Sequence, residues 1–150
     1  MYQRHADGSW GELAARAEFA RYGWLTYDAD NPYCPDDFII RNDQGIYIVS
    51  VKKCSHEFHS EGQFIIQLQG NQPKMTPFQE CHYDLVAGVS KELEKVFLVR
   101  KCDTTVKSFL NLRYHYENRD PRGRTSNDCT PFHRPDWLTK KDFSLPLHVS

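Results

Sequence analysis

Three residues with polar or charged side chains mark the start of one predicted strand and the end of the next. Asp37 directly precedes the apolar run Phe38-Ile39-Ile40, and the run IYIVSV (46–51) contains Ser50 and is followed by Lys52. Because side chains along a strand alternate between the two faces of a sheet, Ser50 and Lys52 share one face. A serine and a lysine on one face of an apolar strand indicate either a frayed end or a site.

Carboxylates and a lysine that converge at one end of a sheet could hydrolyse a phosphodiester bond. That reaction needs a divalent cation held by carboxylate oxygens, because the cation polarises the phosphate and lowers the pKa of a bound water. A nearby lysine can orient the water or stabilise charge on the phosphate. Glu12, in the first turn of a helix expected at 9–23, would supply a carboxylate in addition to that of Asp37.

The same residues also have structural interpretations. Ser9 and Glu12 fit the capping box S-x-x-E, in which the glutamate reaches back to a backbone N–H. The two aspartates after Pro35 suit a turn, and the lysines that end the apolar strand could fray into solvent. Adjacent strand residues face opposite sides, so only one of Asp36 and Asp37 can point at a metal, and we favour Asp37.

Hydrophobic periodicity and turn formers predict the elements that position these residues. Residues 9–23 are predicted to be a helix, because Trp10, Leu13, Ala14, Ala17 and Ala20 recur near a 3.6 period. The turn NDQG (42–45) joins two strands into a hairpin whose first strand begins at Asp37. Strands are predicted at 24–27, 38–41, 46–52, 63–69, 83–89 and 95–101, short helices at 76–82 and 106–114, and a long loop at 117–137. This order indicates an α/β domain with a mixed sheet and a helix packed on it.

Length and composition favour one globular domain over residues 1–150, with a loop-rich C-terminal part from about residue 102. Hydrophobic residues make up 39% of the chain, yet no run approaches the ~20 apolar residues of a membrane helix. The first ten residues lack the apolar core of a signal peptide, so we expect a cytoplasmic protein. The five cysteines are scattered without a CxxC pair, which indicates neither a zinc ribbon nor a disulfide framework.

Positive charge is concentrated between residues 100 and 141, where ten Lys/Arg face five Asp/Glu, although the chain's net charge is −1. Arginines interleaved with aromatic residues suit contacts with phosphates and bases, and a solvated loop is the alternative. Glutamines alternate along QFIIQLQ (63–69), where a β-ribbon could read adenine edges, or where the sheet face is simply solvated. The candidate DNA contacts are Lys53, Gln63, Gln67, Gln69, Arg113, Arg119, Arg122 and Arg124.

The arrangement resembles the PD-(D/E)XK nuclease superfamily. In that superfamily an N-terminal helix carries a glutamate, a PD motif precedes an apolar strand, and a (D/E)-X-K strand follows after a hairpin. The corresponding stretches here are GELAARAEFARYGW (11–24), PDDFII (35–40) and IVSVKK (48–53). The spacing is most similar to that of the small bacterial intron-encoded homing endonucleases with this fold, in which glutamine replaces the second acid.

The resemblance implies a restriction-endonuclease-like core and Mg²⁺-dependent cleavage of double-stranded DNA at a long specific site, with Mn²⁺ able to substitute. It makes Glu12 and Asp37 the metal ligands and Lys52 the residue that orients the nucleophilic water. Ser50 stands where the superfamily has an acid or glutamine, and its hydroxyl is a weak, neutral ligand that acts directly or through water.

Two further expectations concern assembly and alternatives. Cutting both strands of a duplex requires two active sites, so we expect a homodimer or homotetramer. A restriction, junction-resolving or toxin nuclease of the same fold is one alternative. A DNA-binding protein with a decayed nuclease site is the second, and Ser50 is the residue that keeps it open. A role that does not involve nucleic acid is the third.

Overall fold

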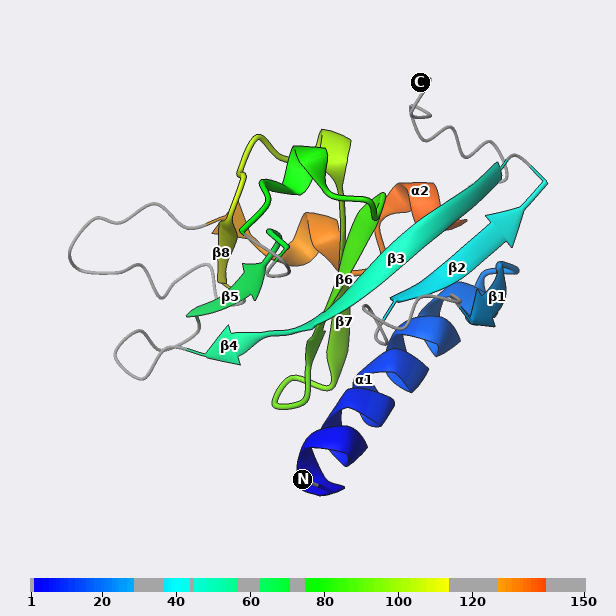
Figure 1. Ribbon diagram of the computed structural model, residues 1–150, viewed down its shortest axis with the longest axis horizontal. Coiled ribbons are helices and arrows are strands. Elements are labelled where there is room, and N and C mark those ends of the chain that lie inside the picture. Colours follow the sequence, from blue (N-terminus) through cyan, green and yellow to red (C-terminus); the bar gives the residue numbers. More distant parts are fainter. Residues whose placement is uncertain are drawn as a thin grey trace.

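One long helix and two β-sheets stack in three layers (Figure 1). The computed structural model describes residues 2–28, 37–43, 45–56, 63–70, 75–113 and 127–139. The helices are α1 (Tyr2–Arg21), α2 (Asp136–Thr139) and the 3-10 turns η1 (Phe78–Glu80), η2 (Lys101–Asp103) and η3 (Thr130–Phe132). None of the helices in the described ranges is long and apolar enough to cross a membrane.

The larger sheet has five strands in the order β1-β2-β3-β6-β7, and only its β3–β6 pair is parallel. These strands are β1 (Leu25–Asp28), β2 (Asp37–Asn42), β3 (Gly45–Lys53), β6 (Leu85–Ser90) and β7 (Lys95–Arg100). The smaller sheet has the order β4-β5-β8-β9 and contains β4 (Ser55–His56), β5 (Gln63–Gln67), β8 (Phe109–Arg113) and β9 (Asn127–Asp128). The predicted mixed α/β architecture with a helix on the sheet is therefore confirmed.

The β2–β3 hairpin forms in the register that the sequence indicates. Asn42 lies opposite Gly45, whose backbone N–H donates to Asn42 Oδ1 at 3.1 Å and closes the turn. Tyr47 and Val49 are buried in the core beneath α1, and the partly buried Val51 packs against it, as the alternation of the run 46–51 requires. The opposite face of β3 is therefore turned away from α1.

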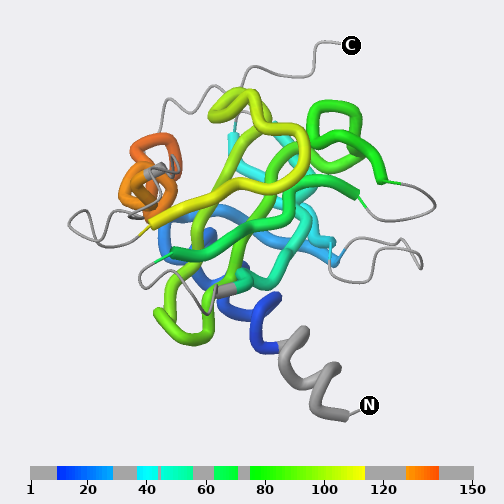
Figure 2. Tube along the Cα trace, turned by 90° about the vertical axis from the view of Figure 1, so that its left-hand side faces the viewer, coloured from blue at the N-terminus to red at the C-terminus, as the bar shows by residue number. Residues whose placement is uncertain are grey.

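Two apolar cores hold the three layers together. The first lies between α1, α2 and the larger sheet, and the second lies between the two sheets. In Figure 2 the strands β5 and β8 cross in front of the larger sheet. The second core contains Phe64 and Ile66 of β5, Leu110 and Leu112 of β8, and Val86, Phe97 and Val99 of the larger sheet. The outward face of β5 and β8 is consequently the face that lies away from both cores.

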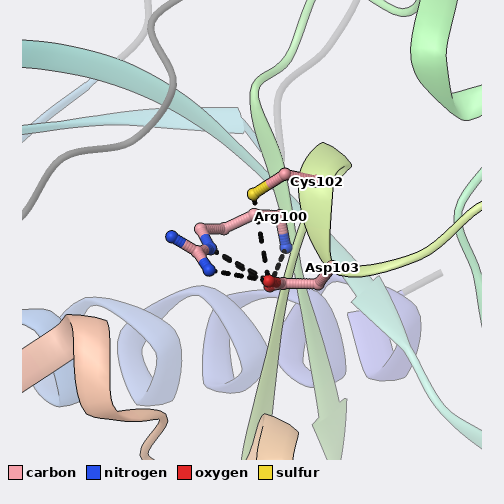
Figure 3. Close-up of polar contacts among 3 residues, drawn as sticks. All are labelled: Arg100, Cys102 and Asp103. Carbon is pink, nitrogen blue, oxygen red and sulfur yellow. Dashed lines mark hydrogen bonds and ion pairs between the residues drawn. The ribbon is translucent and has the colours of Figure 1, made fainter.

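The C-terminal segment 127–139 is fixed to the first core. Trp137 packs in that core, 6.4 Å between ring centroids from Phe19. The Arg100 guanidinium lies 5.2 Å from the Trp137 ring and is bound by Asp103, as Figure 3 shows, with Arg100 Nη2 2.8 Å from Asp103 Oδ1. Trp24 Nε1 donates to the backbone carbonyl of Leu138 at 3.2 Å. This part of the predicted loop 117–137 is therefore ordered structure, with β9, η3 and the start of α2.

The prediction for α1 is wrong in its start and only partly right in its buried face, where Trp10 and Ala14 do pack against the first core. The helix begins at Tyr2, so Glu12 lies in mid-helix and the capping-box interpretation fails. The stripe that packs on the sheet runs through Gly11, Ala15 and Phe19, whereas Leu13 is 66% exposed. Alanine occurs on the buried and on the exposed face of a helix. The alanines of α1 therefore did not distinguish the two faces, and the predicted stripe was displaced by about one position.

Two other short helices were predicted where the structure has different elements. Residues 106–114 contain the strand β8, in which buried Leu110 and Leu112 alternate with exposed Phe109 and Asn111. That alternation has period two and was misread as a short helix. Residues 76–82 form only the single turn η1.

Gly88 of β6 provides a test of how the two sheets stack. A Cβ at position 88 would lie 2.6 Å from Cδ1 and 2.9 Å from Cγ1 of Ile66, which is fully buried. We expect Gly88→Ala to destabilise the fold by ~1–3 kcal/mol, because the buried isoleucine has no room to retreat. Urea unfolding of Gly88→Ala, Ile66→Ala and the double variant measures the effect. The double variant should lose less than the sum of the single losses, and strictly additive losses would contradict this packing.

Candidate functional site

The β2–β3 hairpin brings three of the predicted site residues together. Asp37 lies directly opposite Ser50, and residues opposite each other in an antiparallel pair project from the same face. Lys52 is two residues further along β3 on that face, beside Gly88 of the parallel strand β6. Asp37 and Ser50 are buried at 5% and 4% exposure, while Lys52 is partly exposed. The site lies just before Cys54, where the chain leaves the larger sheet for the smaller one.

The segment 81–84, which leads into β6, forms the other side of this cluster. His82 Nε2 lies 2.7 Å from Asp37 Oδ2. The Lys52 ammonium lies 5.6 Å from the centroid of the Tyr83 ring, in the range of a cation–π contact. Asp37, Lys52, His82 and Tyr83 therefore form one continuous group, of which sequence reasoning identified the first two. His82 comes close to Asp37 because the strand that follows it, β6, pairs in parallel with β3, and no residue pattern indicated that pairing.

Glu12 is placed apart from this group. It projects from α1, on the other face of the sheet, and its Oε1 lies 3.5 Å from Arg16 Nη2. Arg16 also pairs with Asp28 and lies over the ring of Phe38, at 5.3 Å from the ring centroid. The neighbouring Gly11 lies against Val89 and Val51, so Glu12 is near the end of β3 that carries Lys52. In this structure the Glu12 carboxylate pairs with Arg16 and does not join Asp37 in one cluster.

The donor set fits a hydrated Mg²⁺ better than a fully protein-bound metal. Across the described ranges, no group of three His, Cys, Asp or Glu side chains could hold a metal ion. Mg²⁺ characteristically keeps several waters and takes one or two carboxylates together with substrate phosphate oxygens. Asp37 supplies such a carboxylate, and the Ser50 hydroxyl beside it can bind a water of the hydration shell. Burial raises the pKa of the Cys54 thiol to about 12, which keeps it protonated and unsuitable as a metal ligand at neutral pH.

The outward face of β5 and β8 carries several of the candidate DNA contacts. Gln63 lies opposite Arg113, and Gln67 lies opposite the exposed Phe109. The prediction that the glutamines form an exposed row is wrong for Gln63 and Gln69, whose exposures are 9% and 8%. For Gln69 the reason is that β5 ends at Gln67, so the alternation of faces along the strand does not extend to residue 69.

The remaining candidate DNA contacts divide into two groups. Lys53 is exposed at the end of β3, and Gln67 is half-buried, with its Nε2 donating to the Gln69 carbonyl at 3.4 Å. Asn111, exposed at the centre of β8, was missed because that segment was predicted to be helical. Arg119, Arg122, Arg124 and the alternative metal ligand Asp36 lie outside the described residues.

The chain has the fold of a bacterial homing endonuclease. The solved structure of that enzyme, I-Ssp6803I, matches with a TM-score of 0.59 over 85% of this chain and 83% of its own. The two sequences are 12% identical, so the similarity establishes the fold and not the activity. No model of a known protein family matches the chain, and a search of curated proteins finds no match.

The match confirms the nuclease-like fold that the sequence resemblance implied. A mixed five-stranded sheet with flanking helices supports the site. The chemistry of Glu12, Asp37, Ser50 and Lys52 is a separate matter, because a shared fold does not imply a shared function.

Proposed function

We propose that the protein is a metal-dependent endonuclease of the PD-(D/E)XK type that cleaves double-stranded DNA at a specific site, as an intron-encoded homing endonuclease. The observation that carries this proposal is the β2–β3 hairpin, in which Asp37 lies opposite Ser50 with Lys52 two residues further on. The fold shared with I-Ssp6803I supports it.

Each residue of the hairpin has a distinct role in the proposed hydrolysis. A bound Mg²⁺, for which Mn²⁺ can substitute, supplies Lewis-acid polarisation of the phosphate and a bound water of lowered pKa. Asp37 holds the cation through its carboxylate. The Ser50 hydroxyl orients water next to that carboxylate. Lys52, with its ammonium held over the Tyr83 ring, positions the attacking water and stabilises negative charge on the phosphate.

Glu12 is the proposed second carboxylate of the metal site. Its side chain is 29% exposed and forms an i,i+4 pair with Arg16. Arg16 has a second carboxylate partner in Asp28, so the guanidinium keeps an ion pair if the Glu12 carboxylate turns to a hydrated cation. Because α1 packs on the other face of the sheet from Asp37, Glu12 has to leave Arg16 and reach the cation at the end of β3, and in this proposal it does so through a bound water once DNA is bound.

Cleavage of plasmid DNA with random inserts tests the proposed function. Samples contain Mg²⁺, Mn²⁺ or EDTA, and Asp37→Asn is assayed beside the wild type. The proposal predicts discrete linear products that require metal and disappear in Asp37→Asn. Preferred cutting of a four-way junction or of tRNA would favour a junction-resolving or toxin nuclease of the same fold. Tight, salt-sensitive DNA binding without any cleavage would favour a decayed nuclease site. If Ser50→Gln then cleaved DNA, the loss of activity would be due to the serine at position 50.

The outward face of β5 and β8 is the proposed DNA-reading surface. β5 and β8 are the antiparallel central pair of the smaller sheet, and amide side chains on paired strands can bind adenine edges in the major groove of B-DNA. Gln67 and Asn111 are the proposed base contacts on this face, and Lys53 and Arg113 are the proposed phosphate contacts. Gln63 and Gln69 were candidate DNA contacts because they were expected to be exposed, and their burial withdraws that support.

Arg113→Ala should weaken DNA binding and reduce its dependence on salt. If Arg113 neutralises one phosphate, the slope of log K against log salt concentration should fall by about one. Fluorescence anisotropy with the cleaved duplex over a series of salt concentrations measures this slope. Arg41→Ala is the matched control, because Arg41 is an exposed arginine on β2 of the other sheet. An unchanged slope in Arg113→Ala would remove this residue from the phosphate contacts.

Cutting both strands of a duplex requires two copies of the proposed site. A homodimer or homotetramer would supply them with matching symmetry, and we propose such an assembly. Light scattering after size exclusion measures the mass in solution. A monomer that makes double-strand breaks at limiting concentration would contradict the proposed assembly.

A further inference from the structure

We infer that His82 positions the metal-binding carboxylate of Asp37, so that its imidazole does part of the work that a second acid at position 50 would do. This inference rests on the proposed nuclease function. It begins from the contact of 2.7 Å between His82 Nε2 and Asp37 Oδ2.

The contact fixes how the Asp37 carboxylate faces the site. The Asp37 side chain is 4% exposed, and a carboxylate so deeply buried needs hydrogen bonds to offset its lost hydration. An ionised carboxylate only accepts hydrogen bonds, so the imidazole Nε2–H donates to Oδ2. With Oδ2 engaged by His82, Oδ1 is the oxygen left to face a cation.

The segment that carries His82 is held on both sides. The Asp84 backbone N–H donates to the Ile48 carbonyl at 2.8 Å, and Asp84 Oδ2 accepts from the Ile48 N–H at 2.7 Å. The Tyr83 hydroxyl donates to the Leu68 carbonyl at 2.6 Å, and Lys101 Nζ donates to the Cys81 carbonyl at 2.6 Å. Contacts from β3, from Leu68 after β5 and from η2 therefore anchor this short segment. A side chain presented from such a rigid support keeps its geometry without help from the ligand.

The anchoring lysine, Lys101, is partly buried. Burial lowers the pKa of the Lys101 ammonium, and the charges of Asp84 and Cys81 act in the opposite direction. Lys101 thus serves the backbone of the segment, where its ammonium donates to the Cys81 carbonyl. The His82 ring packs edge-on against Tyr83, at 5.2 Å between centroids, which further restricts its rotation.

His82 acts apart from the cysteine next to it. The Cys81 thiol is buried and points away, since its Sγ donates to the backbone carbonyls of Thr76 and Pro77 at 3.4 and 3.3 Å. A Cys–His metal pair is therefore not formed by this segment. The His82 side chain is 48% exposed, which leaves its ring accessible at the edge of the site.

The neutral Ser50 explains why such a positioning residue matters here. An acid at position 50 would share the cation and fix it relative to Asp37, whereas a hydroxyl contributes little charge. Hydrogen-bond partners of a metal-ligating carboxylate typically account for a factor of about 10–100 in metal affinity. His82 occupies that place for Asp37.

Mn²⁺ binding to the whole protein without DNA tests the inference. Electron paramagnetic resonance of free Mn²⁺ gives the Kd of wild type, Asp37→Asn, His82→Phe and His82→Gln. We expect His82→Phe to raise the Kd about 10–100-fold, and His82→Gln, whose amide N–H can replace Nε2–H, to restore most of the affinity. His82→Ala removes the ring without adding bulk and should behave as His82→Phe does. Thermal unfolding confirms that each variant is folded.

The outcomes separate this inference from the proposed function. Loss of Mn²⁺ binding in Asp37→Asn, with wild-type affinity in folded His82→Phe and His82→Ala, would overturn the role of His82 alone. A His82→Gln variant as weak as His82→Phe would also overturn it, because a donated hydrogen bond would then not be the cause. Equal Mn²⁺ binding in wild type and Asp37→Asn would mean that Asp37 holds no cation without DNA and would overturn the role of His82, whereas the proposed function is tested separately by the metal-dependent cleavage assay.

Discussion

Lys52→Met is expected to lower the rate of DNA cleavage by a factor of ~10²–10³ while leaving DNA affinity close to that of the wild type. The Lys52 ammonium lies 5.6 Å from the Tyr83 ring centroid, on the same strand face as Ser50. Methionine is close in length to the apolar stem of lysine and removes the ammonium, with its charge and its hydrogen-bond donors. Stabilisation of charge on the reacting phosphate is therefore lost, and most of the DNA surface is untouched.

Single-turnover cleavage and binding in EDTA measure the two effects separately. Lys107→Met is the matched control, because Lys107 is an exposed lysine between η2 and β8 and outside the proposed site and DNA surface. Full cleavage activity in Lys52→Met would exclude Lys52 from catalysis. An equal loss of cleavage and of binding would make Lys52 a phosphate anchor instead of a catalytic residue.

The hairpin could be predicted from sequence because its determinants are local. The alternation in residues 46–51 fixes which side chains enter the core, and the turn at 42–45 fixes the register. Together these place Asp37 opposite Ser50, which the structure confirms. The same alternation correctly assigns Lys52 to the face of Ser50.

His82 could not be predicted in this way, because its position depends on contacts between distant parts of the chain. It is 45 residues from Asp37, and only the parallel pairing of β3 with β6 brings the two together. Nothing in the residues around position 82 specifies that pairing. The pair of Glu12 with Arg16, by contrast, is local, because residues four apart on one helix are neighbours on its surface.

Trp137 should be among the most sensitive positions for stability, although the sequence indicated a loop there. Trp137 packs against Phe19 and Arg100, and it is 9% exposed. Truncation to alanine removes the ring from the first core and leaves a cavity among Phe19, Trp24 and the larger sheet. We expect Trp137→Ala to lower the free energy of unfolding by ~3–5 kcal/mol, as measured by urea unfolding.

The same variant also tests the separation of the two faces of the sheet. Trp137 lies in the core beneath α1, whereas Asp37, Ser50 and Lys52 face the other side. The folded fraction of Trp137→Ala should therefore cleave DNA at the wild-type rate at low temperature, where most molecules remain folded. Leu13→Ala is the control for apolar truncation, because Leu13 is 66% exposed and should change stability by less than ~0.5 kcal/mol.

Unaltered stability in Trp137→Ala would mean that the C-terminal segment does not dock on the core. Loss of cleavage in a fully folded Trp137→Ala sample would mean instead that the first core also positions the catalytic hairpin.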